Sequence, residues 1–516
     1  MSRPPGCAVI LFLIMFPPAW AASDAERLYA DHCAECHGSD RLGGMGPALL
    51  PENLHRLKRE KAVQVIRRGR PATQMPAFED RLNEQDIEAL TEYIYKPLPQ
   101  VPEWSRMHAE ATRKVFVARE ELPGKPLHDA DPMNLFVVVE LGDHHITILD
   151  GDRFEPLARF PTHFAVHGGP KFSPDGRFVY VSSRDGWIEK FDLWSLKKVA
   201  EVRAGINTRN LAVSADGRHV MVGNYLPHSL VVLDAADLRP LRVIPARSSH
   251  GRSSRISAVY AAPPRGSFIA ALKDIPEVWE ISWESPPPPG FGGWQHDYRE
   301  TSGDAKDSEP FPVRRIPVAD YLDDFFFDPE YIHLIGASRD GGAQVIDLDT
   351  GRRVAELELD GMPHLGSGIT WEWKGRRILA TPNLRKPEIT VIDMENWKTV
   401  ARIPTLGPGF FMRSHENSRY AWADVFFGPN RDAVHIIDKQ TLEIVKTLRP
   451  APGKTAAHVE FDKDGTHALL SIWDMDGAVI VYDTKTLKEI KRLPMVKPSG
   501  KYNVHNKITR SEGTSH

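Results

Sequence analysis

The chain has 516 residues, and its 65 lysines and arginines against 69 aspartates and glutamates leave a net charge of −4. This length exceeds a single compact domain, and the interspersed, nearly balanced charges give no basis for binding nucleic acid. The 42 prolines and 38 glycines, with long helical patterns nearly confined to the first hundred residues, indicate a small helical module followed by a large all-β body.

Residues 1–21 have the pattern of a secretory signal peptide. Arg3 precedes an apolar run from Ala8 to Phe16, and Ala19-Trp20-Ala21 supplies the small residues that a signal peptidase requires. The run is too short for a permanent membrane helix and no later segment is long enough, so we expect no membrane span. Cys7 leaves with this segment; a lipoprotein cysteine is the alternative, but its flanking pattern is missing. We predict a soluble protein of the periplasm.

The motif Cys33-Ala-Glu-Cys36-His37 follows the predicted cleavage site closely. Two cysteines at this spacing form thioethers to the haem vinyl groups, and the adjacent histidine ligates the iron. A zinc or redox pair is the alternative, but it explains neither the adjacent histidine nor the secretion signal. The motif therefore predicts one covalent haem c, which passes electrons singly. Since both mature cysteines attach to haem, we expect no disulfide framework.

Residues 22–97 are predicted to form a small all-α class I cytochrome c domain. Apolar spacing predicts helices over Ala25–Cys33 and Glu84–Tyr95. Between them a Met-Pro-x-Phe loop places Met75 38 residues after the histidine of the motif. We expect Met75 to be the sixth iron ligand, because a thioether raises the reduction potential and suits electron transfer. Met45 or a ligand switch is the alternative.

After a linker over residues 98–133, rich in Pro, Glu and Lys, residues 134–516 contain a repeat. Each unit has an apolar run, a polar turn, a second apolar run ending near an Asp or Glu, and a third run. Steps between units are mostly 41 to 49 residues, and one step of 65 contains an insertion around 282–315. The units begin at Phe136, Gly176, Gly217, Gly266, Tyr331, Gly375, Ser418 and Gly465.

Eight units of short antiparallel strands at this period predict an eight-bladed β-propeller. A pair of open β-sandwiches is the alternative, but it would not require such regular phasing. The predicted fold class is therefore mainly β, an eight-bladed β-propeller preceded by the small cytochrome c domain.

A propeller places the segment before the first strand of every unit around one central channel. A lone histidine near a strand end usually has only a structural hydrogen bond, but recurrence at one repeat position is not expected from that role. Imidazoles suit iron, and guanidinium groups suit carboxylates. The pattern predicts a site for a macrocycle with an iron and carboxylate arms, formed by His167, Arg209, Arg255, His364 and His458.

This architecture resembles the cytochrome cd1 nitrite reductase family over essentially the whole mature chain. The resemblance implies haem d1 in the propeller, with His167 as its proximal ligand. It also implies Arg184, Arg209 and Arg255 as partners of the haem d1 carboxylates, with salt bridges between blades as the alternative. The motifs that carry it are Ser183–Trp194, Gly205–Arg209, Pro363–Gly368 and Pro498–His505.

Departures from that family bear on the reaction. Nitrite reductases place two histidines over the distal face of haem d1; His364 matches one, but Asp324–Asp328, where the other belongs, contains none. His333 is nearby but lies within a strand pattern. Conversely, His458 and Tyr502 occur where the reductases carry other residues. A histidine on each face of the iron leaves no open position for nitrite, which argues against nitrite turnover.

The pattern is similar to the periplasmic dihydro-haem d1 dehydrogenase branch of the family, in which the tetrapyrrole is the substrate. There a propionate side chain becomes an acrylate in the last step of haem d1 biosynthesis. The resemblance implies His167 and His458 as axial ligands, and His364 and Tyr502 as acid–base groups near the reacting side chain. The structural alternatives are that Tyr502 only closes the last blade and that His458 only bonds a neighbouring loop.

Three functions follow as hypotheses. The favoured one is a dehydrogenase that passes electrons from dihydro-haem d1 to its own c haem. The alternatives are a nitrite reductase that makes nitric oxide in an unusual pocket, and a non-catalytic carrier of haem d1. The implied partners are dihydro-haem d1, a nitrite reductase that accepts haem d1, and a soluble electron acceptor such as a small cytochrome c or a cupredoxin.

Overall fold

The computed structural model describes residues 24–44, 46–54, 57–69, 75–100, 102–163, 166, 168–288, 291, 309–338 and 342–509. The predicted signal peptide, Met45 and much of the predicted insertion lie outside the described residues. The described chain forms a helical domain followed by eight sheets, which confirms the predicted fold class.

The N-terminal domain packs its helices around a small apolar core. Its helices are α1 (Asp24–His32), α2 (Ala34–His37), α3 (Pro51–Leu54), α4 (Arg59–Arg68) and α5 (Glu84–Ile94). The core is formed by side chains from α1, α4, α5 and the segment before α5: Tyr29, Ile66, Phe78, Leu82, Ile87, Leu90 and Ile94.

The sequence predicted two of these helices and missed α4. Helix α5 is marked by a capping box, in which the Asn83 side chain accepts from the Asp86 backbone and the Asp86 side chain accepts from the Asn83 backbone. Helix α4 buries only Ala62 and Ile66 in a run of charged residues, so its apolar stripe is too narrow to stand out.

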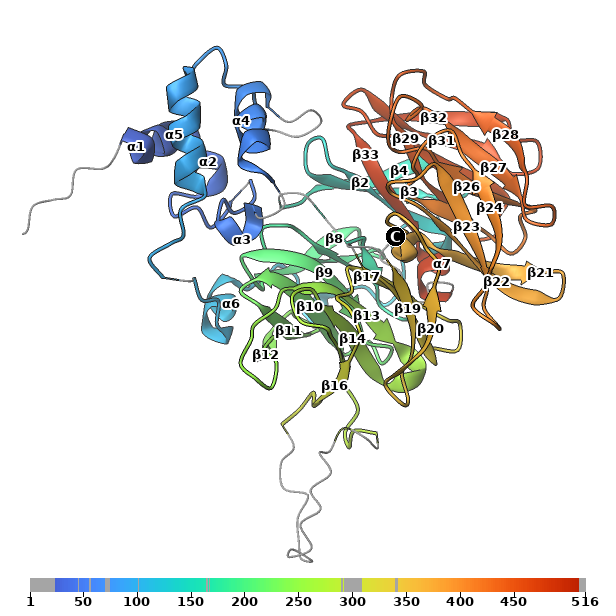
Figure 1. The fold of residues 1–516 in the computed structure, drawn as a ribbon, viewed down its shortest axis with the longest axis horizontal. Helices are drawn as coiled ribbons and strands as arrows, with labels where there is room; N and C mark the ends of the chain where they lie inside the picture. Colours follow the sequence, from blue (N-terminus) through green and yellow to red (C-terminus); the bar gives the residue numbers. More distant parts are fainter. Residues whose placement is uncertain are drawn as a thin grey trace, which may run out of the picture.

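The β body is a ring of eight antiparallel blades (Figure 1). Seven blades have four strands and blade 2 has a fifth, and in every blade but blade 1 the four propeller strands follow in sequence order. The first strands of neighbouring blades contact one another, for example β9 with β13 and β29 with β33, so the first strand of each blade is the innermost. From the innermost strand outward, blade 1 is β33 (Pro498–Asn503), β2 (Leu135–Glu140), β3 (His145–Asp150) and β4 (Glu155–Pro161); blade 2 is β5 (Lys171–Phe172), β6 (Phe178–Ser182), β7 (Trp187–Asp192) and β8 (Lys197–Arg203); blade 3 is β9 (Asn207–Val213), β10 (His219–Leu226), β11 (Ser229–Asp234) and β12 (Pro240–Pro245); blade 4 is β13 (Ile256–Ala262), β14 (Ser267–Leu272), β15 (Glu277–Ser282) and β16 (Val313–Pro317).

The second half of the ring continues in the same order. Blade 5 is β17 (Asp324–Phe327), β18 (His333–Ala337), β19 (Ala343–Asp347) and β20 (Arg352–Leu357); blade 6 is β21 (Ile369–Trp373), β22 (Arg376–Pro382), β23 (Glu388–Asp393) and β24 (Thr399–Pro404); blade 7 is β25 (Met412–Ser414), β26 (Tyr420–Asp424), β27 (Val434–Asp438) and β28 (Ile444–Leu448); blade 8 is β29 (Ala456–Phe461), β30 (His467–Ile472), β31 (Gly477–Asp483) and β32 (Glu489–Met495). The apolar runs of the sequence repeat are the second, third and fourth strands of each blade.

The aspartate that closes the second apolar run of a unit has a local structural role. In blade 2 the carboxylate of Asp192 accepts hydrogen bonds from the backbone N–H groups of Trp194 and Ser195, and in blade 7 Asp438 does the same for Gln440 and Thr441. This carboxylate cap fixes the turn from the third strand of the blade into the fourth, which explains why an acidic residue recurs there.

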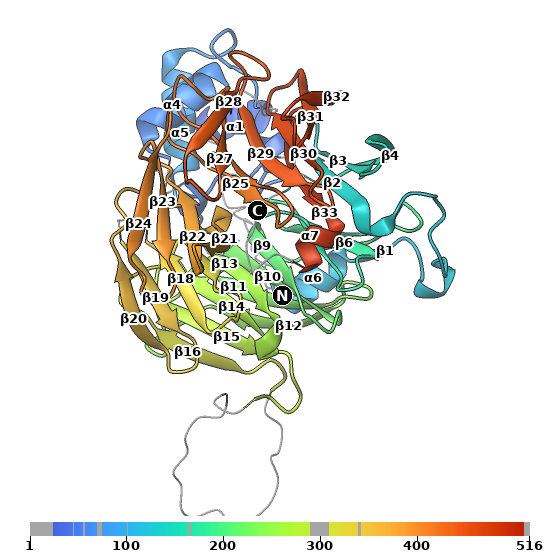
Figure 2. The same cartoon turned by 90° about the vertical axis from the view of Figure 1, so that its right-hand side faces the viewer.

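The C-terminus closes the ring. Strand β33 is the innermost strand of blade 1 and pairs with β2, which sets Tyr502 opposite Val137. Helix α7 (Val504–Thr509) follows and lies beside β33 and β5, where the two ends of the propeller meet (Figure 2). Closure by a strand from the other end of the repeat leaves blade 1 without an open inner edge.

The predicted linker packs against the propeller. It contains α6 (Arg106–Thr112), β1 (Lys114–Val115) and the short 3₁₀ helices η1 (Arg119–Glu121) and η2 (Pro132–Asn134). Strand β1 adds a fifth, outermost strand to blade 2, and α6 contacts β8 and β12. Two further 3₁₀ helices, η3 (Pro263–Arg265) and η4 (Leu365–Ser367), lie in the propeller. In the part of the chain that the structure describes, no helix is both long enough and apolar enough to cross a membrane.

The helical domain contacts the propeller beside blade 3 (Figure 1). Ala48 and Leu50 of the helical domain join Ile206 and Leu226 of the propeller in one buried apolar cluster. A hydrogen bond also joins the two domains: Arg203 donates from Nη2 to the carbonyl oxygen of Leu42 at 3.0 Å. The linker joins this interface, because Trp104 packs against the same cluster and donates from Nε1 to the carbonyl oxygen of Arg203.

Candidate functional site

The helical domain contains a mostly apolar cavity of 320 Å³. The predicted haem attachment residues Cys33, Cys36 and His37 line one part of it, and Met75 also lines it. Leucine, isoleucine and phenylalanine side chains supply further walls, and such a cavity suits a flat porphyrin ring. The structure therefore brings together all four residues that the sequence predicted for haem c.

His37 is set up as an iron ligand by its second ring nitrogen. Its Nδ1 lies 2.7 Å from the carbonyl oxygen of Pro47, which can only accept, so Nδ1 carries the proton and Nε2 keeps its lone pair. Burial lowers the pKa of His37, which also favours the neutral ring. A Cβ at Gly46 would lie 2.7 Å from His37 Cε1, so only glycine lets the loop approach the ring this closely.

The loop that carries Met75 is supported by Gly69 at the end of α4. Gly69 has a φ of +69°, and a Cβ there would lie 2.7 Å from the carbonyl oxygen of Met75. Phe78 returns the loop to α4 by donating its backbone N–H to the carbonyl oxygens of Ile66 and Arg67. The donor set, the apolar walls and these supports fit a covalent haem with histidine and methionine as axial ligands.

A second cavity, of 230 Å³, opens among the innermost parts of blades 2 to 6. It contains three of the predicted residues: Arg184, Arg209 and His364. It also contains polar residues that the sequence reasoning did not assign: Tyr225, Lys273, Asp323, Asp324 and Ser338. Arg209 lies on β9, and its Nε donates to the carbonyl oxygen of Ser257 in the next blade.

His364 faces this cavity as a buried, neutral imidazole. Its Nδ1 lies 2.7 Å from the carbonyl oxygen of Phe410, so Nδ1 donates and Nε2 is left as the basic nitrogen. Burial lowers the pKa of His364, while the nearby Asp324 carboxylate acts in the opposite direction. The nearest carboxylate oxygen, Oδ2 of Asp324, is 3.8 Å from Nε2.

Asp324 is a further candidate residue of this cavity, one that the sequence did not lead us to assign. It belongs to the stretch that was noted only for lacking a histidine, and it lies on the innermost strand of blade 5. Its Oδ2 accepts from the backbone N–H of Gly366 at 2.6 Å, and its Oδ1 accepts from the hydroxyl of Tyr260 at 3.2 Å. The signal was available: Asp324 occupies the same repeat position as the other candidates.

His458 lies at a β-bulge in β29, with a φ of +54°. Its ring is buried between Phe411, at a centroid distance of 4.8 Å, and Tyr502, at 5.2 Å. Among the described residues neither of its ring nitrogens has a hydrogen-bond partner. A buried imidazole normally satisfies at least one nitrogen, so this ring fits a bound metal. The predicted alternative, a bond to a neighbouring loop, has no support from the described ring contacts.

Tyr502 lies on β33, so it both closes blade 1 and contacts His458. Its hydroxyl is held against the backbone, because a Cβ at Gly500 would lie 2.4 Å from the Tyr502 oxygen. Burial raises the pKa of Tyr502 above its usual value, so the hydroxyl stays protonated at neutral pH. It can therefore donate or relay a proton, but it does not act as an anionic base.

Two further predicted residues, Arg255 and His167, are not among those that line the cavity in the described part of the chain. Arg255 does not line the cavity: it forms an ion pair with Asp274 of its own blade, and its Nε lies 2.8 Å from Oδ2 of that carboxylate. This contact favours a salt bridge as the role of Arg255, within one blade and not between blades. His167, the predicted proximal ligand, lies outside the described residues.

Basic side chains recur on the innermost strands. Burial, together with the charges of Arg413 and Arg209, lowers the pKa of Lys171 to about 7. The Nη2 atom of Arg413 is buried without a hydrogen-bond partner among the described residues. A channel that concentrates cations and leaves a guanidinium donor unsatisfied fits a ligand with several carboxylates. The residues are Lys171 on β5, Arg209 on β9, Arg413 on β25 and Lys501 on β33.

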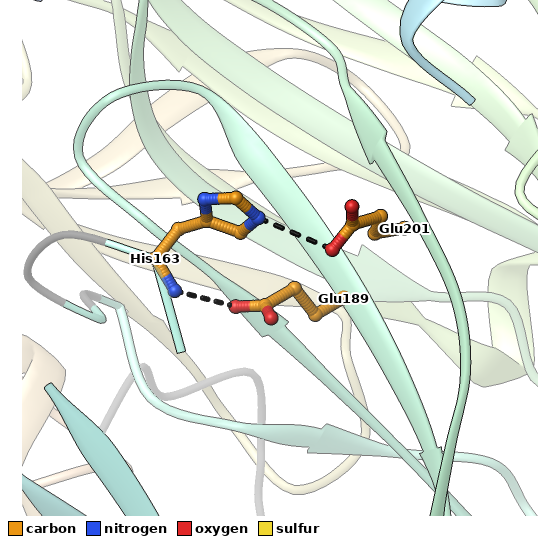
Figure 3. Close-up of side chains that lie close together, drawn as sticks. All are labelled: His163, Glu189 and Glu201. Atoms are coloured by element: carbon orange, nitrogen blue, oxygen red, sulfur yellow. Dashed lines mark hydrogen bonds and ion pairs between the residues drawn. The ribbon is translucent and has the colours of Figure 1, made fainter. Parts of the chain in front are cut away.

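A separate His–Glu cluster lies in blade 2, where His163 bonds to Glu189 and Glu201 (Figure 3). Lys198 forms ion pairs of 2.5 Å with Glu189 and 2.6 Å with Glu201, so its ammonium already neutralises both carboxylates. The His163 ring also stacks on Trp187 at 4.1 Å. These contacts describe a structural ion-pair network, and we assign no metal to it.

Comparison with known proteins supports both halves of the chain. The family model described as "Cytochrome D1 heme domain" matches residues 130–289 and 301–507, and "Cytochrome C oxidase, cbb3-type, subunit III" matches residues 21–94. A dihydro-heme d1 dehydrogenase from Pseudomonas aeruginosa is 56% identical over 492 residues, which cover 95% of this chain and 95% of that protein. A nitrite reductase from Stutzerimonas stutzeri is 25% identical over 541 residues, covering 93% and 92% of the two chains.

A solved structure shows the same arrangement. The "Dihydro-heme d1 dehydrogenase NirN in complex with DHE" superimposes with a TM-score of 0.85 at 56% identity, and the match covers 94% of this chain and 100% of that chain.

Proposed function

Because this chain belongs to the cytochrome D1 heme domain family, we propose that it is a dihydro-haem d1 dehydrogenase. It oxidises a propionate side chain of dihydro-haem d1 to the acrylate of haem d1, and the electrons leave through its covalent haem c. The observation that carries the proposal is the buried His458 ring, whose two nitrogens have no partner among the described residues. An iron ligand at that place leaves the substrate iron closed to nitrite when His167 binds its other face.

The basic residues of the propeller bind the substrate carboxylates. Arg184 and Arg209 line the cavity beside His364, and the Nη2 atom of Arg413, on the innermost strand of blade 7, is buried without a hydrogen-bond partner among the described residues. Arginine holds carboxylates through paired, charge-assisted hydrogen bonds, which fix the orientation of a rigid tetrapyrrole. Arg255 contributes little to binding the substrate carboxylates, because its guanidinium already forms an ion pair with Asp274.

His364 is the proposed base. Its neutral Nε2 removes a proton from the carbon next to the substrate carboxylate, and the Asp324 carboxylate at 3.8 Å stabilises the imidazolium that forms. The hydroxyl of Tyr502 acts as a proton relay or orients the reacting arm. The saturated –CH₂–CH₂– unit becomes –CH=CH– with the loss of two protons and two electrons, and no oxygen atom is transferred.

Cys33, Cys36, His37 and Met75 would hold haem c, which would supply a one-electron acceptor. Two electrons must therefore leave one at a time, and a soluble acceptor, a small cytochrome c or a cupredoxin, takes them from the protein. The product passes to a nitrite reductase that requires haem d1. The predicted signal peptide supports a periplasmic location for this reaction, as part of haem d1 biosynthesis for denitrification.

The first experiment mixes dihydro-haem d1 anaerobically with at least two equivalents of the oxidised protein, because each c haem takes one of the two electrons. The visible spectrum follows the c haem, and mass analysis follows the extracted tetrapyrrole. We expect a loss of two mass units together with reduction of the c haem. If the protein binds the tetrapyrrole without changing its mass, in the presence of a working electron acceptor, the dehydrogenase is excluded and a carrier of haem d1 becomes the interpretation. Steady formation of nitric oxide from nitrite would instead identify a reductase.

A further inference from the structure

Asp424, the last residue of β26 in blade 7, is a fully buried carboxylate between the segments that hold the two candidate histidines. Its Oδ1 accepts from the backbone N–H groups of Phe410 at 2.8 Å and Phe411 at 3.0 Å. Its Oδ2 accepts from the backbone N–H of His458 at 3.2 Å. One carboxylate thus joins the loop that enters blade 7 to the innermost strand of blade 8.

The same loop holds His364 of blade 6. The carbonyl oxygen of Phe410 accepts from Nδ1 of His364, and the Phe410 ring packs against the imidazole at 4.3 Å. The next residue, Phe411, packs its ring against His458 at 4.8 Å. An unbroken series of contacts therefore runs from His364 through Phe410 and Asp424 to His458.

The backbone at both ends of this series needs support. His458 has a φ of +54°, a region that a non-glycine residue adopts at a cost, so its conformation must be held by its neighbours. Asp424 binds its N–H, and Lys501 donates from Nζ to its carbonyl oxygen. On the other side, a Cβ at Gly409 would lie 2.7 Å from the carbonyl oxygen of Asp424, so only glycine allows the loop to approach β26 this closely.

We propose that Asp424 is a positioning residue that fixes the iron ligand His458 and the base His364 in one rigid frame before the substrate binds. It touches neither the substrate nor the reacting atoms, and it acts through backbone N–H groups. The inference rests on the proposed function, because that function assigns the roles of the two histidines. A frame built in advance avoids ordering both side chains at the moment of binding.

The test compares Asp424→Asn with the parent protein, both carrying haem c and both titrated with ferric haem d1. In the variant the side-chain carbonyl oxygen still accepts from the backbone N–H groups of Phe410 and Phe411. The side-chain NH₂ group, however, is a donor that faces the backbone N–H of His458, so that hydrogen bond is lost. We expect about tenfold weaker binding of haem d1, the size that loss of one hydrogen bond to a charged acceptor predicts. We also expect part of the bound iron to change from low spin to high spin in its visible and electron paramagnetic resonance spectra.

Asp438→Asn is the matched control. Asp438 also lies in blade 7 and also accepts from backbone N–H groups, those of Gln440 and Thr441, but it is in the outer turn. We expect this variant to keep the affinity and spin state of the parent. A low-spin spectrum and unchanged affinity in Asp424→Asn would overturn the proposal, and so would an equal change in both variants.

A measurement on the parent protein covers the case in which Asp424→Asn does not fold. Hydrogen exchange of the amides of Phe410, Phe411 and His458 is followed with and without haem d1. A frame built in advance predicts slow exchange at all three amides before ligand is added. Fast exchange that slows only on binding would contradict it.

The outcome is separable from that of the proposed function. If the parent binds haem d1 but does not oxidise its dihydro precursor, the dehydrogenase fails, while the spin state of the variants still decides the role of Asp424. If the precursor is oxidised and Asp424→Asn matches the parent in affinity and spin state, only the positioning role fails.

Discussion

The imidazole of His364 combines two properties that a base in this reaction needs. Burial lowers the pKa of His364. The ring therefore stays neutral at pH values at which an exposed histidine would already be protonated. The bond from Nδ1 to Phe410 leaves Nε2 basic and directed towards Asp324. The carboxylate partly opposes the effect of burial, because it favours the protonated ring.

Asp324→Asn should change both the rate and its pH dependence. Removing the carboxylate removes a charge that raises the pKa of His364, so that pKa falls further. The neutral base then persists to lower pH, and the acid limb of the profile of kcat/KM moves to lower pH. At the same time the imidazolium loses its counter-charge, and we expect kcat to fall on the order of tenfold to a hundredfold.

Stopped-flow measurement of c-haem reduction by dihydro-haem d1, repeated over pH 5 to 8, checks this prediction. Asp328→Asn is the control, because Asp328 also pairs with a histidine, His333, at 2.8 Å, but outside the cavity. An acid limb that moves to higher pH in Asp324→Asn would contradict the assigned electrostatics.

Tyr502→Phe should slow the reaction without weakening binding. Burial raises the pKa of the Tyr502 hydroxyl, so the group is a proton donor across the working pH range and its loss removes a relay. We expect kcat to fall on the order of a hundredfold, with the affinity for haem d1 retained, because the aromatic contact with His458 remains.

Single-turnover conversion of dihydro-haem d1, with mass analysis of the product, measures the effect of Tyr502→Phe. Tyr180→Phe removes another buried hydroxyl, one that donates to the carbonyl oxygen of Ala235 away from the site, and it should leave kcat unchanged. Unchanged conversion by Tyr502→Phe would reduce that residue to its part in closing blade 1.

At the scale of elements, the end of α4 and the Met75 loop act together. Gly69 ends α4 with a positive φ and lets the loop return close to the helix, where Phe78 bonds to its last turn. Sequence spacing predicted the Met75 loop but not the helix that supports it. The loop has a local motif, whereas α4 depends on a narrow apolar stripe whose burial is decided by α1 and α5.

Gly69→Ala should disturb the sixth ligand of haem c. The added Cβ meets the carbonyl oxygen of Met75 at 2.7 Å, and the positive φ disfavours alanine, so the loop must move. We expect weakening of the red absorption band of methionine-ligated ferric haem and a lower reduction potential, since the thioether ligand raises it.

A redox titration followed by visible spectroscopy measures this change. Gly124→Ala is the control, because a Cβ there meets nothing within 4 Å and Gly124 has no positive φ. An unchanged band and potential in Gly69→Ala would show that Gly69 does not control the methionine ligation of haem c.

At the scale of the whole molecule, the contact between the two domains should govern electron transfer. Leu50 is 1% exposed and packs with Ile206 and Leu226 of the propeller. Leu50→Asp places a carboxylate in this apolar contact, which is unfavourable by several kcal/mol, so the domains separate. We expect c-haem reduction by bound dihydro-haem d1 to slow on the order of tenfold or more.

Direct reduction of the c haem by dithionite should be unchanged in Leu50→Asp, which separates the effect on docking from damage to the haem site. Leu127→Asp is the matched control, because Leu127 is 67% exposed on the linker. Equal rates of reduction by substrate in Leu50→Asp and the parent would mean that this contact does not set the path between the domains.

Several features of the protein were determined by the sequence alone. The haem attachment motif is contiguous, so its chemistry does not depend on the rest of the fold. The number of blades follows from the period of the apolar runs and their closing aspartates, whose side chains cap local turns. Repeat position then placed Arg209, His364 and His458 around one axis, because equivalent segments of a propeller point to the same channel.

Other features were decided only by the tertiary structure. Arg255 has the same repeat position as Arg209, yet Asp274 binds it, and that pairing depends on a turn 19 residues later. The roles of Asp324 and Asp424 arise from contacts between different blades, across tens of residues of sequence. Closure of blade 1 by β33 joins the two ends of the repeat. Repeat position alone could point to Asp324, but it could not show which groups these residues contact, because each contact is made by single side chains that meet only after the ring has closed.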